Sequence, residues 1–211
     1  MYDDSFYAVS RAGMIASAQA LVPLLMTQCQ WPQTVIDVGC GEGWWAVEFE
    51  RHGCDVRAMD GDWHGDHQLG DRFIPHNLAD PIPTIGDVDV ELFDAVVCLE
   101  VAEHLRPARA RTFINDLCDL TTPDGYVIFS AAIPGQGGTG HLNEQWPVYW
   151  SKLFNENGFA VNSDFRFGIW DDDRIENWYR QNLMIAYRGI QMADPISVVH
   201  PILYDARRAR R

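Results

Sequence analysis

Hydrophobic and polar residues alternate along this chain in blocks that predict a sheet built from β–α units. Short apolar or β-branched runs at residues 34–38, 55–59 and 93–99 have the length and continuity of strands that are buried on both faces. Apolar residues recur at helical spacing between them, as at residues 44–52, where Gly53 ends the pattern. Strands that alternate with helices in this way favour a mostly parallel sheet covered by helices on both faces.

The rest of the chain continues this pattern. A helix is predicted over residues 12–28, ahead of the first strand and placed to cover a site. Loops are predicted where proline or glycine is frequent, at residues 79–91 and 134–140. Further strands are predicted at residues 72–74, 126–131, 159–165 and 183–187. Further helices are predicted at residues 101–120, with a break at Pro107, and at residues 150–157. Residues 170–181 are predicted to form a polar aromatic insert. The fold class is therefore α/β, with seven strands and a late hairpin.

Three segments are expected: a helical cover over residues 1–33, a catalytic domain over residues 34–190 and an extension with a basic tail over residues 191–211. With 47% hydrophobic residues the chain can bury one core. The apolar stretch at residues 20–26 is interrupted by Pro23 and is much shorter than the ~18 residues that a membrane span needs. Because no leader pattern precedes it either, we expect neither a membrane protein nor a secreted one.

Cysteine usage and charge limit the cellular compartment and the classes of partner that we expect. The five cysteines never form a C-x-x-C pair and mostly lie in apolar runs, which predicts reduced thiols in a cytoplasmic protein without a disulfide framework or a structural zinc site. The net charge is −14, although arginines occupy positions 207, 208, 210 and 211. Such an acidic body repels a phosphate backbone, so nucleic acid is not expected as a partner. The basic tail is expected to be a solvated end, with a hook for an acidic surface as the alternative.

The strongest motif is Val-Ile-Asp-Val-Gly-Cys-Gly-Glu-Gly at residues 35–43. Alternate glycines directly after a buried strand let the main chain approach a ligand closely, and the helix that follows offers unpaired N–H groups. Asp60 ends the next strand about twenty residues later, where a carboxylate can accept both hydroxyls of a ribose. Either feature alone also fits a tight turn or a surface carboxylate, but together they favour an adenosine-containing ligand.

With these motifs, residues 34–187 resemble the class I S-adenosylmethionine-dependent methyltransferases. The first motif of that family, E/D-x-G-x-G-x-G, is complete, and residues 93–105 are similar to its fourth motif in the form Glu-Val-x-Glu-His-Leu. Residues 120–130 resemble its Leu-x-Pro-Gly-Gly turn, with Asp124 in place of one glycine. Asn77 stands where many members have an acid that holds the adenine amino group.

The resemblance implies a Rossmann-like fold, S-adenosylmethionine as the cofactor and S-adenosylhomocysteine as the product. It also implies a set of residues that line the cofactor: Asp37, Gly39, Cys40, Gly41, Gly43, Asp60, Gly61, Asn77, Leu78 and Leu99.

Methyl transfer is an in-line displacement, which needs positioning more than it needs an enzyme nucleophile. The lack of an evident Ser-His-Asp or Cys-His arrangement is therefore expected. His104 or His141 is predicted to act as the base, with Glu100 in contact with cofactor or substrate.

The same stretch offers a metal site as an alternative. On a helix, spacings of three and four place Glu100, Glu103 and His104 on one face. Similar family members, including small-RNA 3′-end and ubiquinone-pathway O-methyltransferases, hold a divalent metal with such a set and a further histidine, and His141 lies where that histidine would be. The metal would lower the pKa of the acceptor hydroxyl. A metal-free site is preferred, because the motif is common in metal-free members.

Aromatic residues alternate with amides and carboxylates at residues 143–150, 169–173 and 177–182, as a site for a sugar face or a flat ring requires. These stretches resemble segments of bacterial methyltransferases associated with glycan genes. Any one of the aromatics can instead cap the sheet. The glycines at residues 137–140 predict a mobile lid. Acceptor contacts are expected from Trp146, Tyr149, Trp150, Trp170, Asn177 and Tyr179.

The sequence thus predicts a cytoplasmic methyltransferase that acts on a hydroxyl of a small molecule or a glycan precursor. Two alternatives stay open: a methyltransferase for a nucleic-acid end or base, and a non-catalytic cofactor-binding module. The acceptor and the oligomeric state stay undetermined.

Overall fold

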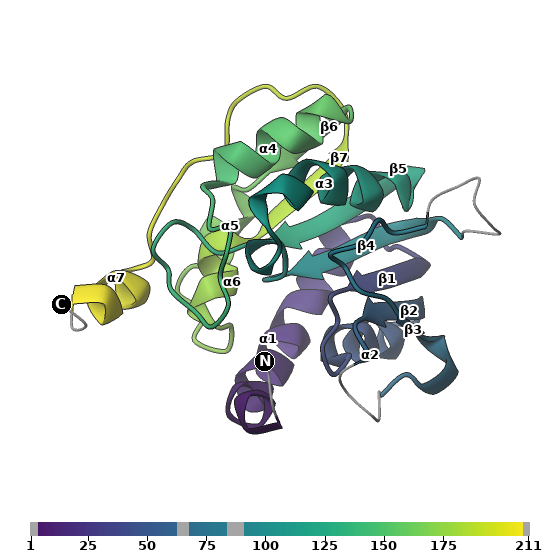
Figure 1. Cartoon of the computed structure of the whole chain (residues 1–211), viewed down its shortest axis with the longest axis horizontal. Coiled ribbons are helices and arrows are strands. Elements are labelled where there is room, and N and C mark those ends of the chain that lie inside the picture. The colour runs from purple at the N-terminus through teal and green to yellow at the C-terminus, as the bar shows by residue number, and fades with distance from the viewer. Residues whose placement is uncertain (1–3, 63–67, 84–90, 209–211) are drawn as a thin grey trace.

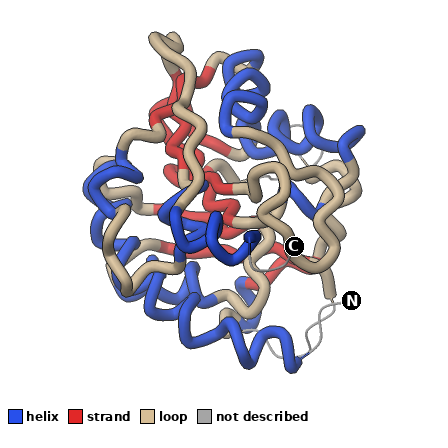
Figure 2. Tube along the Cα trace, turned by 90° about the vertical axis from the view of Figure 1, so that its left-hand side faces the viewer, coloured by secondary structure: helices blue, strands red, loops and turns tan. Residues whose placement is uncertain are grey.

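A computed structural model describes residues 4–62, 68–83 and 91–208, which form an α/β fold of three layers (Figures 1 and 2). In this described part, seven strands make one sheet in the order β3-β2-β1-β4-β5-β7-β6. Strands β1 to β5 run parallel to one another, whereas β7 is antiparallel to both β5 and β6. The predicted fold, a mostly parallel sheet with a late antiparallel strand, is confirmed. The strands are β1 (Thr34–Val38), β2 (Asp55–Asp60), β3 (Phe73–Pro75), β4 (Phe93–Leu99), β5 (Thr121–Ser130), β6 (Phe159–Asn162) and β7 (Met184–Arg188).

Helices cover both faces of the sheet because the strands are apolar on both sides (Figure 2). Along β1, Ile36 and Val38 pack with the helices α3 and α4, whereas Val35 packs with α1 and α2 on the opposite face. The result is two hydrophobic cores separated by the sheet. The helices are α1 (Asp4–Gln28), α2 (Trp44–Arg51), α3 (Ala110–Asp119), α4 (Pro147–Glu156), α5 (Phe165–Ile169), α6 (Asn177–Asn182) and α7 (Pro201–Arg208).

One predicted element is wrong in a way that matters for the site. Residues 101–120 were expected to be a single helix, but α3 begins only at Ala110. Two short 3₁₀ turns, Ala102–His104 and Pro107–Arg109, precede it. Glu100 has a φ of +56°, which a right-handed helix excludes. The shared helical face expected for Glu100, Glu103 and His104 therefore does not exist, and these side chains are positioned by a loop at the end of β4.

Other boundaries differ from the prediction by smaller amounts. Helix α1 begins at Asp4 rather than at residue 12, and β5 begins at Thr121 rather than at residue 126. Strand β6 ends at Asn162, so Phe165 starts a helix instead of ending a strand. No helix of the described chain combines the length and the apolar character that crossing a bilayer requires.

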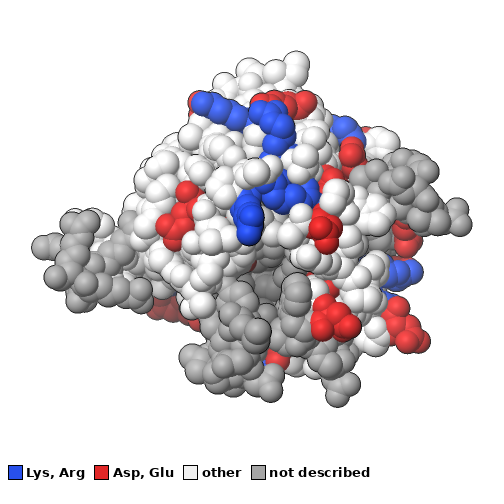
Figure 3. Space-filling view, viewed as in Figure 1, with Lys and Arg blue, Asp and Glu red and all other residues white. Residues whose placement is uncertain are grey.

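The C-terminal segment passes over the α5–α6 side of the fold and ends in α7, which stands away from the sheet in Figure 1. The buried guanidinium of Arg166 attaches this segment, because it donates to the carbonyls of Ser163 (2.8 Å), Ile196 (2.8 Å) and Gln181. On the face shown in Figure 3, basic side chains lie over α3 and α4 with acidic ones beside them. Residues 84–90 of the predicted acidic loop, and Arg210 and Arg211 of the basic tail, lie outside the described residues.

Candidate active site

The glycine-rich turn after β1 is folded tightly onto the end of β2. The N–H groups of Gly39 and Cys40 both donate to the carbonyl of Met59, at 2.7 and 3.2 Å. Gly39 has a φ of +83°, and a Cβ added there would lie 2.3 Å from a methyl carbon of Val101. Only glycine fits this position without strain or a clash. The glycine at residue 39 is therefore required by the close approach of the loop that follows β4.

Asp60 organises the same turn from the neighbouring strand. Its carboxylate accepts hydrogen bonds from the N–H of Gly41 at 2.8 Å and of Gly61 at 2.6 Å. The side chain is half-buried at the carboxyl end of β2. The glycine turn and the carboxylate predicted for the cofactor thus lie side by side, in direct contact. Asn77, by contrast, is exposed and accepts from the N–H of Ala79 in a local turn.

Asp37 supplies a second carboxylate, at the end of β1, that is almost fully buried. One of its oxygens, Oδ2, has no hydrogen-bond partner among the residues that the structure describes. Burial and the nearby charge of Asp60 raise the pKa of Asp37 to about 7, although a hydrogen bond from the main chain of Ala46 opposes the shift. A buried, unpaired carboxylate oxygen favours a cationic group or water as its partner.

The first turn of α2 and the start of α1 meet at this site. The guanidinium of Arg11 forms an ion pair with Glu42, which lies within the glycine-rich turn, and Trp44 Nε1 donates to Glu42 at 2.9 Å. The predicted N-terminal helix is therefore in contact with the turn.

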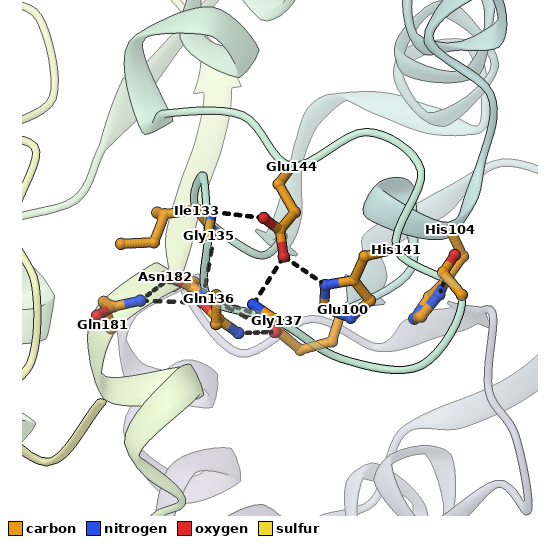
Figure 4. A network of polar contacts seen from close by, with 11 residues as sticks. Glu100, His104, Ile133, Gly135, Gln136, Gly137, His141, Glu144, Gln181 and Asn182 are labelled. Atoms are coloured by element: carbon orange, nitrogen blue, oxygen red, sulfur yellow. Dashed lines mark hydrogen bonds and ion pairs between the residues drawn. The ribbon is translucent and has the colours of Figure 1, made fainter. Parts of the chain in front are cut away.

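Glu100 lies at the end of β4 in a strained, left-handed conformation that several hydrogen bonds maintain. Its N–H is shared between the carbonyl and the hydroxyl of Ser130, at 3.0 and 3.1 Å. Its carboxylate accepts from the amides of Asn182 (3.1 and 3.3 Å) and Gln136 (3.2 Å). Gln181 completes this amide network, since it donates to Gln136 and Asn182 (Figure 4). It also accepts from the N–H of His200.

Glu103, His104 and His141 form a compact group beside this network. Each offers one ligand atom, and these atoms lie within 4.8 Å of one another. The His104 and His141 rings meet edge to face, with centroids 4.8 Å apart. Glu100 lies outside this group, so the expected four-residue metal set reduces to three residues.

Charge in this group is unfavourable in the absence of a cation. Glu103 is fully buried, and neither carboxylate oxygen has a well-formed hydrogen bond. Burial and the neighbouring Glu100 raise the pKa of Glu103 well above its ordinary value, and nearby main-chain N–H groups oppose this only in part. Burial and the charge of His141 lower the pKa of His104, against a contact with the carbonyl of Gly140.

The predicted acceptor residues separate into two groups. Trp150 is fully buried against Phe129 in the core between β5 and α4, so its expected contact with an acceptor is corrected to a packing role. Tyr179 is also buried, edge-on to Trp45 at 5.1 Å between ring centroids. Positions open at least in part to solvent are those of Trp146, Tyr149, Trp170 and Asn177, and the Oδ1 atom of Asn177 is buried without a partner.

Four polar residues of the site were not predicted individually, although the last three lie in stretches expected to bind the acceptor: Gln136, Glu144, Gln181 and Asn182. They come from the loop after β5 and from the end of α6. In the folded chain Gln136, Gln181 and Asn182 hydrogen-bond to one another, and Glu144 contacts His141 (Figure 4). The one signal in the sequence was the amide-rich composition near residues 143–145 and 181–182.

Comparison with known proteins places this site in a wider context. A family model described as "Methyltransferase domain" matches residues 11–182. A ubiquinone biosynthesis O-methyltransferase from Alkalilimnicola ehrlichii is 33% identical over 102 residues, which cover 46% of this chain and 40% of that protein. The matched part thus spans about two fifths of the length of that relative.

Solved structures share the fold at low sequence identity. A 1,6-didemethyltoxoflavin-N1-methyltransferase from Burkholderia thailandensis, crystallised with 1,6-didemethyltoxoflavin and S-adenosylhomocysteine, aligns with a TM-score of 0.62 at 18% identity, over 89% of this chain and 83% of that one. A magnesium protoporphyrin IX methyltransferase from Synechocystis, with S-adenosylhomocysteine, aligns with a TM-score of 0.58 at 18% identity, over 90% and 89%.

Proposed function

Because the chain belongs to the methyltransferase domain family, whose model matches residues 11–182, we propose that it transfers a methyl group from S-adenosylmethionine to a hydroxyl of a small molecule or a glycan precursor. The observation that carries this proposal is the pairing of the glycine turn at residues 39–43 with the carboxylate of Asp60. The residues fit the donor on one further ground, because Asp37 offers a buried oxygen without a partner among the described residues.

When bound, S-adenosylmethionine supplies a methyl group on a sulfonium, and the carbon–sulfur bond breaks, with its electron pair left on sulfur, as the acceptor oxygen bonds to that carbon. The protein's own part is binding and proton removal. Asp60 accepts hydrogen bonds at the end of β2, where the two ribose hydroxyls of the donor would compete with main-chain N–H groups. Asp37 places a carboxylate where a cation is stabilised.

The proton of the acceptor hydroxyl passes to a histidine in this proposal. His141 is the better candidate base, because its Nδ1 atom is engaged by Glu144, which leaves Nε2 as the acceptor. His104 lies beside it, and burial keeps it neutral by lowering its pKa. Trp146, Tyr149, Trp170 and Asn177 are the proposed acceptor contacts, since each is at least partly open to solvent.

The donor half of the proposal is tested by Asp60→Ala, with Asp55→Ala at the exposed start of the same strand as the matched control. Calorimetry should show that Asp60→Ala weakens S-adenosylmethionine binding by at least about 100-fold, as expected for losing two charge-assisted hydrogen bonds at about 1.5–3 kcal/mol each. The control should bind as the wild type does. Equal affinity in both variants would contradict the proposal.

The acceptor half is tested by labelled methyl transfer to pools of phenols and nucleotide sugars. Oxygen methylation is expected, and a labelled nitrogen product would overturn the choice of a hydroxyl. Transfer to RNA or DNA ends would favour the nucleic-acid alternative. S-adenosylmethionine binding without release of S-adenosylhomocysteine would favour a non-catalytic module.

A second candidate is a divalent metal at Glu103, His104 and His141, and the buried, unpaired oxygens of Glu103 favour it. One carboxylate and two imidazoles are a donor set that suits several first-row divalent ions. Such an ion would polarise the acceptor hydroxyl. Added Mn²⁺ or Zn²⁺ should raise the melting temperature of the wild type but not of Glu103→Gln. A chelator that leaves both methylation and melting unchanged would contradict the metal site.

A further inference from the structure

Glu144 is a carboxylate of the loop after β5 with three hydrogen-bond partners. Its Oε1 atom faces His141 Nδ1 at 2.9 Å and accepts from the N–H of Gly137 at 2.8 Å. Its Oε2 atom accepts from the N–H of Gly135 at 2.5 Å. The side chains of Glu144 and His141 are 19% and 12% exposed, so both are largely shielded from solvent. Figure 4 shows Glu144 with these partners around it.

The contact determines which nitrogen of His141 carries the proton. An ionised carboxylate only accepts hydrogen bonds, so the hydrogen of a neutral His141 must be on Nδ1 and the lone pair on Nε2. The main-chain N–H groups of Gly135 and Gly137 donate to the two oxygens of Glu144, one to each, so both oxygens act as acceptors.

The loop approaches the Nε2 atom of His141 closely, which a glycine at residue 138 permits. A Cβ added at Gly138 would lie 2.2 Å from Nε2 of His141, and the φ of Gly138 is +158°. The neighbours of this ring are His104, 4.8 Å away between ring centroids, and Glu103, which belongs to the same group of ligand atoms. Nε2 is therefore the nitrogen of this ring that Glu144 does not engage.

We propose that Glu144 is a positioning residue that holds His141 in the tautomer with a free Nε2. The same Glu144 side chain also binds the main chain of the loop at residues 135–137. The inference rests on the proposed function, because proton acceptance and metal binding by His141 both need that free Nε2 atom. One carboxylate thus couples the position of the loop at residues 135–137 to the tautomer of His141.

The test is Glu144→Gln, with Glu156→Gln as the matched control. Glu156 is an exposed carboxylate at the end of α4 that pairs with Arg111. Glutamine has one oxygen, so it can accept from Gly135 or from the His141 and Gly137 side, but not from both. We expect kcat to fall about 10- to 100-fold, as for loss of a partner that orients an active-site histidine. The KM for S-adenosylmethionine should not change, and the control should behave as the wild type does.

The tautomer gives a readout that needs no turnover. ¹⁵N NMR of the histidine rings, with His141 assigned from the signals missing in His141→Gln, should show the proton on Nδ1 in the wild type and a mixture of tautomers in Glu144→Gln. A wild-type proton on Nε2 would overturn the proposal, and so would an unchanged kcat in Glu144→Gln. If that variant does not fold, the wild-type spectrum decides alone. Failure of the proposed function appears separately, as absent donor binding in a protein with the expected tautomer.

Discussion

Burial changes the ionisation of Asp37. Its pKa is about 7 because the carboxyl is buried and lies near Asp60, while an unfolded aspartate has a value of about 4. Near neutral pH the folded protein therefore takes up a proton that the unfolded chain does not. A cation bound at the unpaired Oδ2 atom would reverse this shift, so donor binding should release a proton near pH 7.

This ionisation predicts a pH-dependent effect of Asp37→Asn on stability. Below about pH 4 both states of the wild type hold the proton, and the variant gains nothing. As pH rises from about 4 to 7, Asp37 loses its proton in the unfolded wild type but keeps it in the folded one. The free energy of unfolding of the wild type therefore falls over this range. Above pH 8 the variant should be more stable by up to roughly 4 kcal/mol. Urea unfolding at pH 4 and pH 8 measures this, with the exposed Asp124→Asn as the control. Equal gains at both pH values would contradict the assignment.

Single residues were predicted unevenly, and the reason is physical. Gly39, Asp37 and Asp60 could be predicted because a turn between a strand and a helix imposes a local spacing on them. Gln136 and Asn182 could not, because their meeting at Glu100 depends on the path of two distant segments. The positive φ of Glu100 leaves no sequence signal at all, since glutamate rarely adopts it.

At the scale of elements, the turn between β1 and α2 depends on its contact with the loop after β4. Gly39 and Gly53 have similar left-handed φ values, +83° and +92°, but only Gly39 faces a neighbour, Val101. Gly53→Ala should therefore cost about 1–2 kcal/mol from backbone strain alone. Gly39→Ala should cost about 1–3 kcal/mol more from overpacking.

The double variant Gly39→Ala/Val101→Ala should recover most of that additional loss, because it removes the methyl groups that clash. Chemical denaturation of the two single variants and the double variant gives the coupling energy. If the losses in free energy of unfolding simply add in the double variant, residues 39 and 101 are not energetically coupled.

Strand β6 lies at the edge of the sheet, and a side chain completes its hydrogen bonding. The N–H of Val161 donates to Oε1 of Gln191 at 2.5 Å, and Nε2 of Gln191 donates to the Val161 carbonyl at 3.1 Å. An edge without such a cover is open to pairing with another strand.

Gln191→Ala should leave the Val161 amide without a partner. Its hydrogen exchange should accelerate about tenfold, which corresponds to about 1.4 kcal/mol and lies in the range of one hydrogen bond. The amide of Val96 in the central strand β4 serves as an internal control and should not change. Acceleration at both sites would indicate global destabilisation instead.

Most strands could be predicted from apolar runs, because a strand buried on both faces is apolar throughout. The error at residues 101–109 arose because Val101, Ala102 and Leu105 continue an apolar pattern that also fits a helix. These residues do face the core, but in 3₁₀ turns around Pro107.

At the scale of the whole molecule, Arg166 joins three segments that are distant in sequence. Its guanidinium is fully buried and donates to three main-chain carbonyls, and burial lowers its pKa to about 10. Arg166→Met would leave these carbonyls unpaired at about 1–3 kcal/mol each. We expect a loss of several kcal/mol in thermal or urea unfolding, against none for the exposed Arg106→Met. A small loss would show that water replaces the guanidinium.

The amide network around Glu100 has a consequence for protein engineering. Glu100, Gln136, Gln181 and Asn182 are joined by hydrogen bonds, yet they belong to three separate stretches of the chain. Transplanting only one of these stretches from a relative would leave polar atoms in the other two without hydrogen-bond partners. New acceptor preferences should therefore be grafted by exchanging all three stretches as a set, and recombination libraries that cross over between them should yield few active chimaeras.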